Sequence, residues 1–269
     1  MSDLRPAAVA GTFYPKAPTA LAAAVGACLH AAAGSRGPAG STPPKAVIVP
    51  HAGYVYSGAI AAAAYARLAV GRDVIRRVVL LGPTHRVPVR GLALPSARAF
   101  ATPLGEVAVD LDAATAALGL PQVRASDAAH ALEHSLEVQL PFLQAVLGAF
   151  QIVPFAVGDA TPEEVAEVID LLWGGPETLF VVSSDLSHYH RYADAQAIDR
   201  ATAEAILGLS PDLDHEQACG ATPINGLLLS ARRRGLAPEL LDLRNSGDTA
   251  GDRSRVVGYA SFAFVAGPR

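Results

Sequence analysis

The sequence predicts an α/β protein with a mostly parallel central sheet, helices on both faces and a small antiparallel hairpin region. Three short apolar runs, at 45–50 (KAVIVP), 76–82 (RRVVLLG) and 151–158 (QIVPFAVG), have the composition of buried strands and end in loops. Helical patterns separate several of these runs, and strands that alternate with helices favour a parallel sheet covered on both sides. Residues 91–110 alternate short apolar pieces with Pro and Gly, which is typical of antiparallel hairpins.

Two further strands and two helices complete this prediction. TLFVVSSDLSHYH at 178–190 runs from a strand into a polar loop, and VVGYASFAFV at 256–265 is a final apolar strand. Thr161-Pro162 begins a helix whose apolar positions repeat at helical spacing. The segment EHSLEVQLPFLQ at 133–144 is also predicted to be helical, with leucines on its apolar face.

The chain is predicted to form one domain over residues 1–269. The linker-like segment is GSRGPAGSTPP at 34–44, whose Gly, Ser and Pro content predicts a loop. The single alanine-rich helix before it cannot make an independent core, so the loop does not divide two domains. Cys28 falls within that helix, where a small thiol packs as a hydrophobic side chain.

Composition excludes several classes of protein. Hydrophobic residues make up 51% of the chain and charged residues 17%, which is incompatible with a mostly disordered protein. A formal net charge of −4 and scattered basic residues argue against nucleic-acid binding. No apolar run approaches the roughly 20 residues of a membrane span, and the N-terminal residues lack the pattern of an export signal. We therefore expect a cytoplasmic protein.

Three histidines follow apolar strands in the same way. His51 comes after AVIVP, His85 after VVLLGPT and His188 after FVVSSDLS. Because loops at the carboxyl ends of parallel strands gather at one edge of a sheet, these side chains are expected to converge on a shared crevice. Polar groups in such a crevice are more often functional than structural.

The histidines and one cysteine form a candidate metal site. Cys219 lies in the polar segment EQACGATPING, and imidazole and thiolate are good ligands for Fe, Cu or Zn. Ligation by His51, His85 and Cys219 would leave coordination positions open, as a catalytic metal requires. Asp185 and His188, three residues apart, are candidates for an acid/base pair in which the carboxylate fixes the imidazole tautomer.

Each of these assignments has a structural alternative. A histidine at a strand end can serve only to shape the loop, which is the alternative for His51 and His85. Cys219 can be a buried residue near a helix start, and His188 can cap a turn. His190 in HYHRY is interpreted as a solvent-exposed residue instead of a second base.

Three more residues are candidates for contact with a substrate. His134 is equally consistent with substrate contact and with a structural link between helix and pocket. Glu133 is interpreted as its partner or as a charge at a helix N-terminus. Tyr54, like Tyr56, is a candidate for the pocket mouth, with loop or core packing as the alternative.

Five ordered motifs carry a resemblance to a known family. They are PHAGYVYSG, LGPTHR, EHSLEVQLPFLQ, VVSSDLSHYH and GDTAGDRSRVVGYASFAF, and together they span nearly the whole chain. The sequence resembles the Memo family, which includes protein B of the AmmeMemoRadiSam system. The fold of that family is similar to that of class III extradiol dioxygenases of the LigB type.

The resemblance implies a metal pocket formed by His51, His85 and Cys219, with Asp185 and His188 matching the family's D-x-S-H motif. In the related dioxygenases two histidines and a carboxylate hold Fe(II), so a thiolate in place of the carboxylate departs from ring-cleaving chemistry. It also implies iron or copper as the metal and an AMMECR-type protein and a radical SAM protein as partners.

These considerations lead to three functional hypotheses. The first is a metal-dependent oxidoreductase, dioxygenase-like, that holds iron or copper and acts on an unknown small molecule. The second is a non-catalytic module that binds a metal, a peptide or a partner protein. The third is a zinc-dependent hydrolase, because metal-bound water beside a base such as His188 is also hydrolytic machinery.

Overall fold

The computed structural model describes residues 3–33 and 42–267, and most of the predicted loop at 34–44 lies outside these ranges. Its main sheet has the strand order β10-β12-β2-β9-β3-β8-β4-β7, with β11 paired to β12. A smaller sheet has the order β1-β5-β6. The strands are β1 (Leu4–Arg5), β2 (Ala46–Val49), β3 (Arg77–Pro83), β4 (Leu92–Leu94), β5 (Ala99–Thr102), β6 (Gly105–Ala108), β7 (Val123–Ala125), β8 (Gln151–Val157), β9 (Thr178–Ser183), β10 (His188–His190), β11 (Leu236–Asn245) and β12 (Val256–Ala266).

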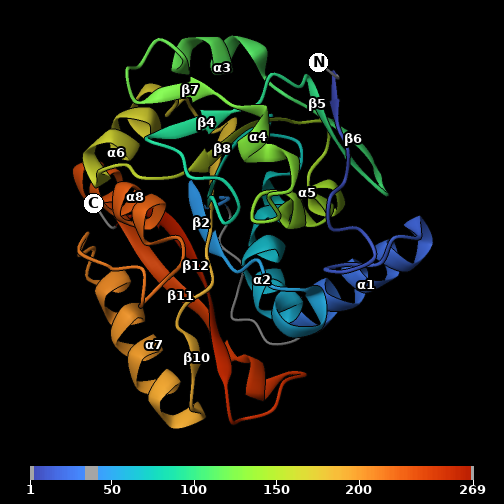
Figure 1. Ribbon diagram of the computed structural model, residues 1–269, viewed down its shortest axis with the longest axis vertical. Coiled ribbons are helices and arrows are strands. Elements are labelled where there is room, and N and C mark those ends of the chain that lie inside the picture. The colour runs from blue at the N-terminus through green and yellow to red at the C-terminus, as the bar shows by residue number, and fades with distance from the viewer. Residues whose placement is uncertain (1–2, 34–41, 268–269) are drawn as a thin grey trace.

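Helices cover both faces of the main sheet, as predicted. In Figure 1, α1, α2 and α5 lie to the right of the sheet, whereas α6, α7 and α8 lie to its left. The helices are α1 (Pro18–Ala33), α2 (Tyr54–Leu68), α3 (Leu111–Ala117), α4 (Asp127–Ala131), α5 (Leu140–Val146), α6 (Pro162–Leu171), α7 (Tyr192–Leu207) and α8 (Ala221–Arg233), with 3-10 turns η1 (Ala69–Gly71), η2 (Glu137–Gln139) and η3 (Ser246–Asp248).

The predicted parallel strands form the centre of the main sheet. β2, β9, β3 and β8 are neighbours and pair in parallel. Their side chains are almost all buried, which explains why the sequence shows continuous apolar runs instead of alternation. Antiparallel pairs flank this centre, at β12 on one side and β4 on the other. The carboxyl ends of β2, β3 and β9 therefore meet at one edge.

The helix predicted after Thr161 is confirmed, including its start. The Thr161 hydroxyl accepts the Glu164 backbone N–H, and the Glu164 carboxylate accepts the Thr161 N–H, which is a complete capping box. The predicted hairpin region is also present: β5 and β6 pair in antiparallel register, with Gly105 at φ +122° where the chain turns. β4, from the same region, instead joins the main sheet.

Several segments differ from the prediction, among them residues 188–190, which form the short strand β10 instead of a loop. β11 is not predicted, because Pro238 and several charged side chains interrupt its apolar pattern. Within the part of the chain that the structure describes, one edge of β11 pairs with β12 and the other pairs with no strand, and an edge strand tolerates such residues. The helix expected at 133–144 begins only at Leu140, after the η2 turn. The backbone N–H groups of His134 and Ser135 bind the Glu133 carboxylate, which holds this part of the chain in a non-helical turn.

A buried ion pair fixes the N-terminal segment against the 130–139 segment. Arg5 pairs with Glu137, and both side chains are almost fully buried. Arg5 also donates to the backbone carbonyls of His130 and Glu133. Glu137 further accepts the Tyr14 hydroxyl at 2.5 Å and backbone N–H groups of residues 8 and 9. This network positions the turn that carries Glu133 and His134.

Among the helices of the described residues, none has both the length and the apolar character that crossing a bilayer requires.

The buried pair generates a stability prediction. Arg5→Ala leaves the Glu137 carboxylate buried without its cation, so the free energy of unfolding should fall by about 3–5 kcal/mol. The matched control is Arg233→Ala, which removes a pair with Asp170 whose arginine side chain is 52% exposed and should cost less than about 1 kcal/mol. Urea unfolding of both variants measures the two losses, and equal losses would contradict the assignment.

Candidate metal centre

His51 lies directly after β2 and is held by two polar contacts. Its backbone N–H donates to Asp185 Oδ1 at 2.7 Å, and its ring Nδ1 lies 2.9 Å from Ser183 Oγ at the end of β9. The side chain is buried, with 2% of the residue exposed. Burial and the neighbouring His85 and His134 lower the pKa of His51 well below its ordinary value, so its ring is neutral at pH 7.

The contacts of Ser183 determine which His51 nitrogen carries the hydrogen. The Ser183 hydroxyl has one hydrogen, which it donates to the Ser135 carbonyl at 2.6 Å. It must therefore accept its other contacts, from Gln139 Nε2 at 2.8 Å and from His51 Nδ1. His51 is thus the Nδ1–H tautomer, and its Nε2 has a lone pair that is directed into the site and can bind a metal.

His85 lies in the loop after β3 and is oriented by the carboxylate of Glu133. Its backbone N–H donates to Glu133 Oε2 at 2.6 Å, and its ring Nδ1 lies 2.9 Å from Glu133 Oε1. Because an ionised carboxylate only accepts hydrogen bonds, Nδ1 of His85 carries the hydrogen. Nε2 therefore keeps a lone pair that can bind a metal. The His85 side chain is 29% exposed, so the site is open to solvent on this side.

Glu133 is a buried carboxylate that stays ionised. Burial favours its neutral form, but the hydrogen bonds and charge of His85 and backbone N–H groups of His85 and Ser135 outweigh this and lower its pKa to about 2. The His134 backbone N–H adds a further donor at 2.9 Å. The carboxylate therefore places a fixed negative charge directly behind the imidazoles.

His134 is the third histidine of the cluster. Its ring stacks on His85 with 4.6 Å between centroids and lies edge-on to His51 at 5.3 Å. Its Nδ1 lies 3.3 Å from Glu133 Oε1, and burial lowers its pKa to about 4, with His85 acting in the same direction and Glu133 opposing it. One ligand atom from each of His51, His85 and His134 lies within 4.8 Å of the other two, so these residues could hold one metal ion.

Cys219 borders this cluster through His51. Its Sγ lies 3.3 Å from His51 Nε2 and 3.6 Å from the carbonyl oxygen of Asp185. Burial, then the Asp185 charge, raises the pKa of the thiol to about 12, so in the absence of a cation it is protonated. Among the described residues, the metal-ligand atoms that all lie within 4.8 Å of one another belong to His51, His85 and His134. Cys219 is not part of this group.

Asp185 and His188 come from the loop after β9, but they do not form the expected pair. The Asp185 carboxylate instead binds the backbone N–H groups of His51 and Ala52, so it positions the His51 loop. Burial raises the pKa of Asp185 to about 7 against these hydrogen bonds. The His188 ring forms a hydrogen bond with the backbone of Leu186, so the Asp185 carboxylate does not fix the His188 tautomer. Burial also lowers the pKa of His188.

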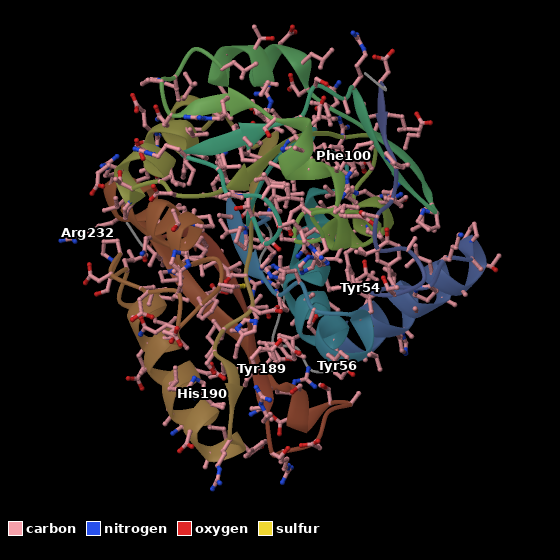
Figure 2. All side chains as sticks on the ribbon, viewed as in Figure 1. Tyr54, Tyr56, Phe100, Tyr189, His190 and Arg232 are labelled. Atoms are coloured by element: carbon pink, nitrogen blue, oxygen red, sulfur yellow. The ribbon has the colours of Figure 1, made fainter. Side chains whose placement is uncertain are left out.

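The two tyrosines after His51 differ in their surroundings. Tyr54 donates its hydroxyl to the Val138 carbonyl at 2.7 Å and packs its ring on Phe142, as the packing alternative describes. Tyr56 is 40% exposed. Figure 2 shows Tyr56 close to Tyr189 in projection, below the centre of the molecule. His190, predicted to be exposed, is half-buried.

Sequence reasoning did not identify the residues that fix the ring of His51. Ser183 and Gln139 fix the His51 tautomer, and Ser135 receives the Ser183 hydrogen, yet none was a candidate. One signal was available for Ser183, because a polar residue at the carboxyl end of a buried strand lies at the same edge as His51. Gln139 gave no such signal, because its position depends on how η2 packs.

Comparison with known proteins places the chain among relatives of similar length. A family model described as "Memo-like protein" matches residues 5–263. Proteins named "MEMO1 family protein" from Aquifex aeolicus and Aeropyrum pernix are each 36% identical, over 97% and 95% of this chain and 99% and 98% of their own lengths. One from Sulfolobus acidocaldarius is 38% identical over 81% of each chain.

A solved structure shares the fold. The crystal structure of an uncharacterized protein from Escherichia coli K12 superposes with a TM-score of 0.53 at 13% identity and covers 81% of this chain and 98% of its own. At this identity the likeness extends to the fold alone.

NMR of the metal-free protein tests which nitrogen of His51 carries the hydrogen. Long-range proton–nitrogen spectra should show His51 with hydrogen on Nδ1 and none on Nε2. Ser183→Ala removes the acceptor, so His51 should become a mixture of tautomers, whereas Ser230→Ala, at another buried serine in α8, should leave the spectrum of His51 unchanged. An Nε2–H tautomer in the unmodified protein would refute the argument.

The low pKa of Glu133 predicts a pH-dependent stability. Because its folded pKa is about 2 and its ordinary value 4.5, its ionisation stabilises the fold above pH 4.5, and this contribution, about 3 kcal/mol, is lost as the pH falls toward 2. In metal-free protein, the difference in unfolding free energy between the unmodified chain and Glu133→Gln should therefore shrink between pH 6 and pH 3. The exposed control Glu163→Gln should show no such trend; a constant difference for Glu133→Gln would count against the assignment.

Proposed function

Because this chain belongs to the Memo family, we propose that it is a metal-dependent oxidoreductase that holds one iron or copper ion at His51, His85 and His134. The observation that carries this proposal is the convergence of three imidazoles, two of which have Nδ1–H fixed by Ser183 and Glu133. Imidazole ligands suit iron, copper and zinc.

The charge around the imidazoles supports a cation. Neutral rings at His51 and His134 expose lone pairs, and the ionised Glu133 lies behind His85 and His134 with no lysine or arginine bound to its carboxylate among the described residues. A divalent ion would compensate this buried negative charge. The carboxylate–histidine arrangement is the one that orients metal-bound imidazoles and raises their basicity in many proteins.

Cys219 is the alternative third ligand. Its Sγ is 3.3 Å from His51 Nε2, and a bound cation would favour the thiolate against the burial that now raises its pKa. A thiolate among the ligands would shift the preference toward copper(I) or zinc. His134 is favoured as the third ligand because its donor atom is within 4.8 Å of both other histidines.

The residues around the site have separable tasks in this proposal. His188 is the proton acceptor, because burial lowers its pKa and leaves it neutral at pH 7. Asp185, with a pKa of about 7, holds the His51 loop and can exchange a proton near neutral pH. A bound iron or copper ion would supply one-electron redox chemistry to a small substrate entering on the exposed side of His85.

A binding role is the second candidate, and a specific surface favours it. Val55 and Tyr56, in the first turn of α2 just after the His51 loop, are 68% and 40% exposed. Such apolar exposure beside the site suits a peptide or protein partner, for which the AMMECR-type and radical SAM proteins remain the proposal. Co-purification with these proteins, compared between the unmodified chain and Val55→Ser, tests it; no association in either case would argue against this role.

Metal analysis of the purified protein tests the main proposal. The unmodified protein should carry close to one iron or copper per chain, and His51→Ala and His85→Ala should each weaken metal binding by more than about a hundredfold, since changes to residues that merely support ligands already cost 10–100-fold. His30→Ala, at an exposed histidine of α1, is the matched control. Zinc in place of iron or copper would favour a hydrolase, and full occupancy in both site variants would refute the metal centre.

Cobalt(II) substitution then identifies the third ligand. If His134 binds the ion, His134→Ala should alter the cobalt spectrum and Cys219→Ser should leave it nearly unchanged. A thiolate-to-cobalt charge-transfer band that Cys219→Ser abolishes would instead assign Cys219.

A further inference from the structure

An open hollow of about 740 Å³ lies on the surface outside the histidine cluster. It is formed where β10, the start of α7 and the connection between β11 and β12 meet, at the lower end of the molecule in Figure 1. Its lining includes Tyr189, which Figure 2 labels, together with Tyr192, Arg191, Arg253 and Arg255.

The hollow concentrates positive charge in a chain whose formal net charge is −4. Three arginines line it and no acidic residue does. None of the three forms an ion pair with a described residue, although most ion pairs of the described part of the chain involve arginine. The nearby carboxylates of Asp248 and Asp252 accept hydrogen bonds from Tyr192, Asn245 and Ser254 instead. An anion would therefore meet uncompensated cations.

Two of the guanidinium groups are held in place by aromatic rings. The guanidinium of Arg253 lies over the Tyr192 ring at 4.5 Å from its centroid, and that of Arg255 lies over the Tyr189 ring at 5.1 Å. Contact through the guanidinium face leaves N–H groups at its edge available for a ligand, apart from the Arg253 Nε–H, which donates to the Gly247 carbonyl at 3.4 Å. Stacking also reduces the side-chain entropy that binding would otherwise cost.

The N-terminal end of α7 also borders the hollow, and its first N–H, that of Tyr192, already donates to the Arg253 carbonyl at 3.3 Å. This 16-residue helix begins at Tyr192, and its N-cap residue Arg191 makes no side-chain capping hydrogen bond. Ala193, in the first turn, also lines the hollow. The positive end of a helix dipole thus lies beside the three arginines, an arrangement that favours anions.

Tyr189 has a strained backbone at the border of the hollow. Its φ of +63° is uncommon for a bulky residue, and the pairing of β10 with β12 shifts register between His188 and His190, on either side of it. The residue is 63% exposed, so packing does not explain the strain. Its ring lies 5.7 Å from the His188 ring on one side and contacts Arg255 on the other. Backbone strain of this kind is concentrated at functional sites.

We propose that this arginine hollow binds the phosphate group of a phosphorylated small molecule. A phosphate dianion offers three terminal oxygens to guanidinium donors, whereas one bidentate arginine already satisfies a carboxylate. The volume exceeds that of a phosphate group and leaves room for an organic remainder. The direction of the organic part rests on the proposed oxidoreductase function. If that function holds, the organic part of the ligand would extend past Tyr189 toward His188.

Calorimetric titration with inorganic pyrophosphate, on metal-stripped protein in chelator, tests the site. The unmodified chain should bind saturably, and Arg253→Gln and Arg255→Gln should each weaken binding about tenfold or more. Arg232→Gln, the matched control at an exposed arginine labelled on the far left of Figure 2, should change affinity by less than about twofold. Circular dichroism confirms that the variants are folded.

Four outcomes would overturn the proposal. The first is the absence of saturable binding, and the second is an equal loss in Arg232→Gln, which would indicate nonspecific charge attraction. The third is loss of binding in His51→Ala, which would place the anion at the histidine cluster. Malonate that binds as tightly as pyrophosphate would overturn the preference for phosphate. Because all titrations are made without metal, failure of the metal centre leaves this result unaffected.

Discussion

The candidate site depends on a single hydroxyl hydrogen. Ser183 donates it to Ser135, and this leaves the Ser183 oxygen able only to accept from Gln139 and His51. If Ser183 were free to donate to His51, the imidazole hydrogen would move to Nε2 and block the nitrogen that faces the other histidines. A network buried between β9, the turn at 135 and η2 therefore decides what the His51 ring can bind.

The two sides of the site are built on different chemistry. On the His51 side, neutral groups fix the ring, and burial keeps it uncharged. On the other side, Glu133 is ionised and binds both His85 and His134. Imidazoles backed by a carboxylate are better electron donors than those backed by a hydroxyl, so a cation would be held most firmly near Glu133. This asymmetry favours His134 over Cys219, which lies on the neutral side and whose thiol is protonated.

The sequence predicted the strands and the edge where the site forms, because continuous apolar runs followed by histidines are local patterns. It predicted His51 and His85 at one place, and the structure brings their rings to 5.2 Å. It could not predict that Asp185 binds the backbone of residue 51 instead of His188, because that choice depends on the register between β2 and β9. β11 was missed for a similar reason, because its polar pattern is compatible with a strand only at an edge of the sheet, and the sequence does not show that position.

The strained conformation of Tyr189 persists because its neighbours are fixed from two directions. Backbone hydrogen bonds join Leu186 and Ser187 to Gly258 of β12, and the Ser187 N–H also binds the buried Asp199 of α7. A Cβ at position 258 would lie 2.1 Å from Asp199 Oδ2, so only glycine allows α7 and β12 to approach this closely. These contacts hold residues 185–188 in place, so the segment does not move to relieve the backbone strain at Tyr189. Asp185, which binds the backbone of His51, and Tyr189, which borders the arginine hollow, therefore lie at the two ends of one short segment that β12 and α7 hold in place.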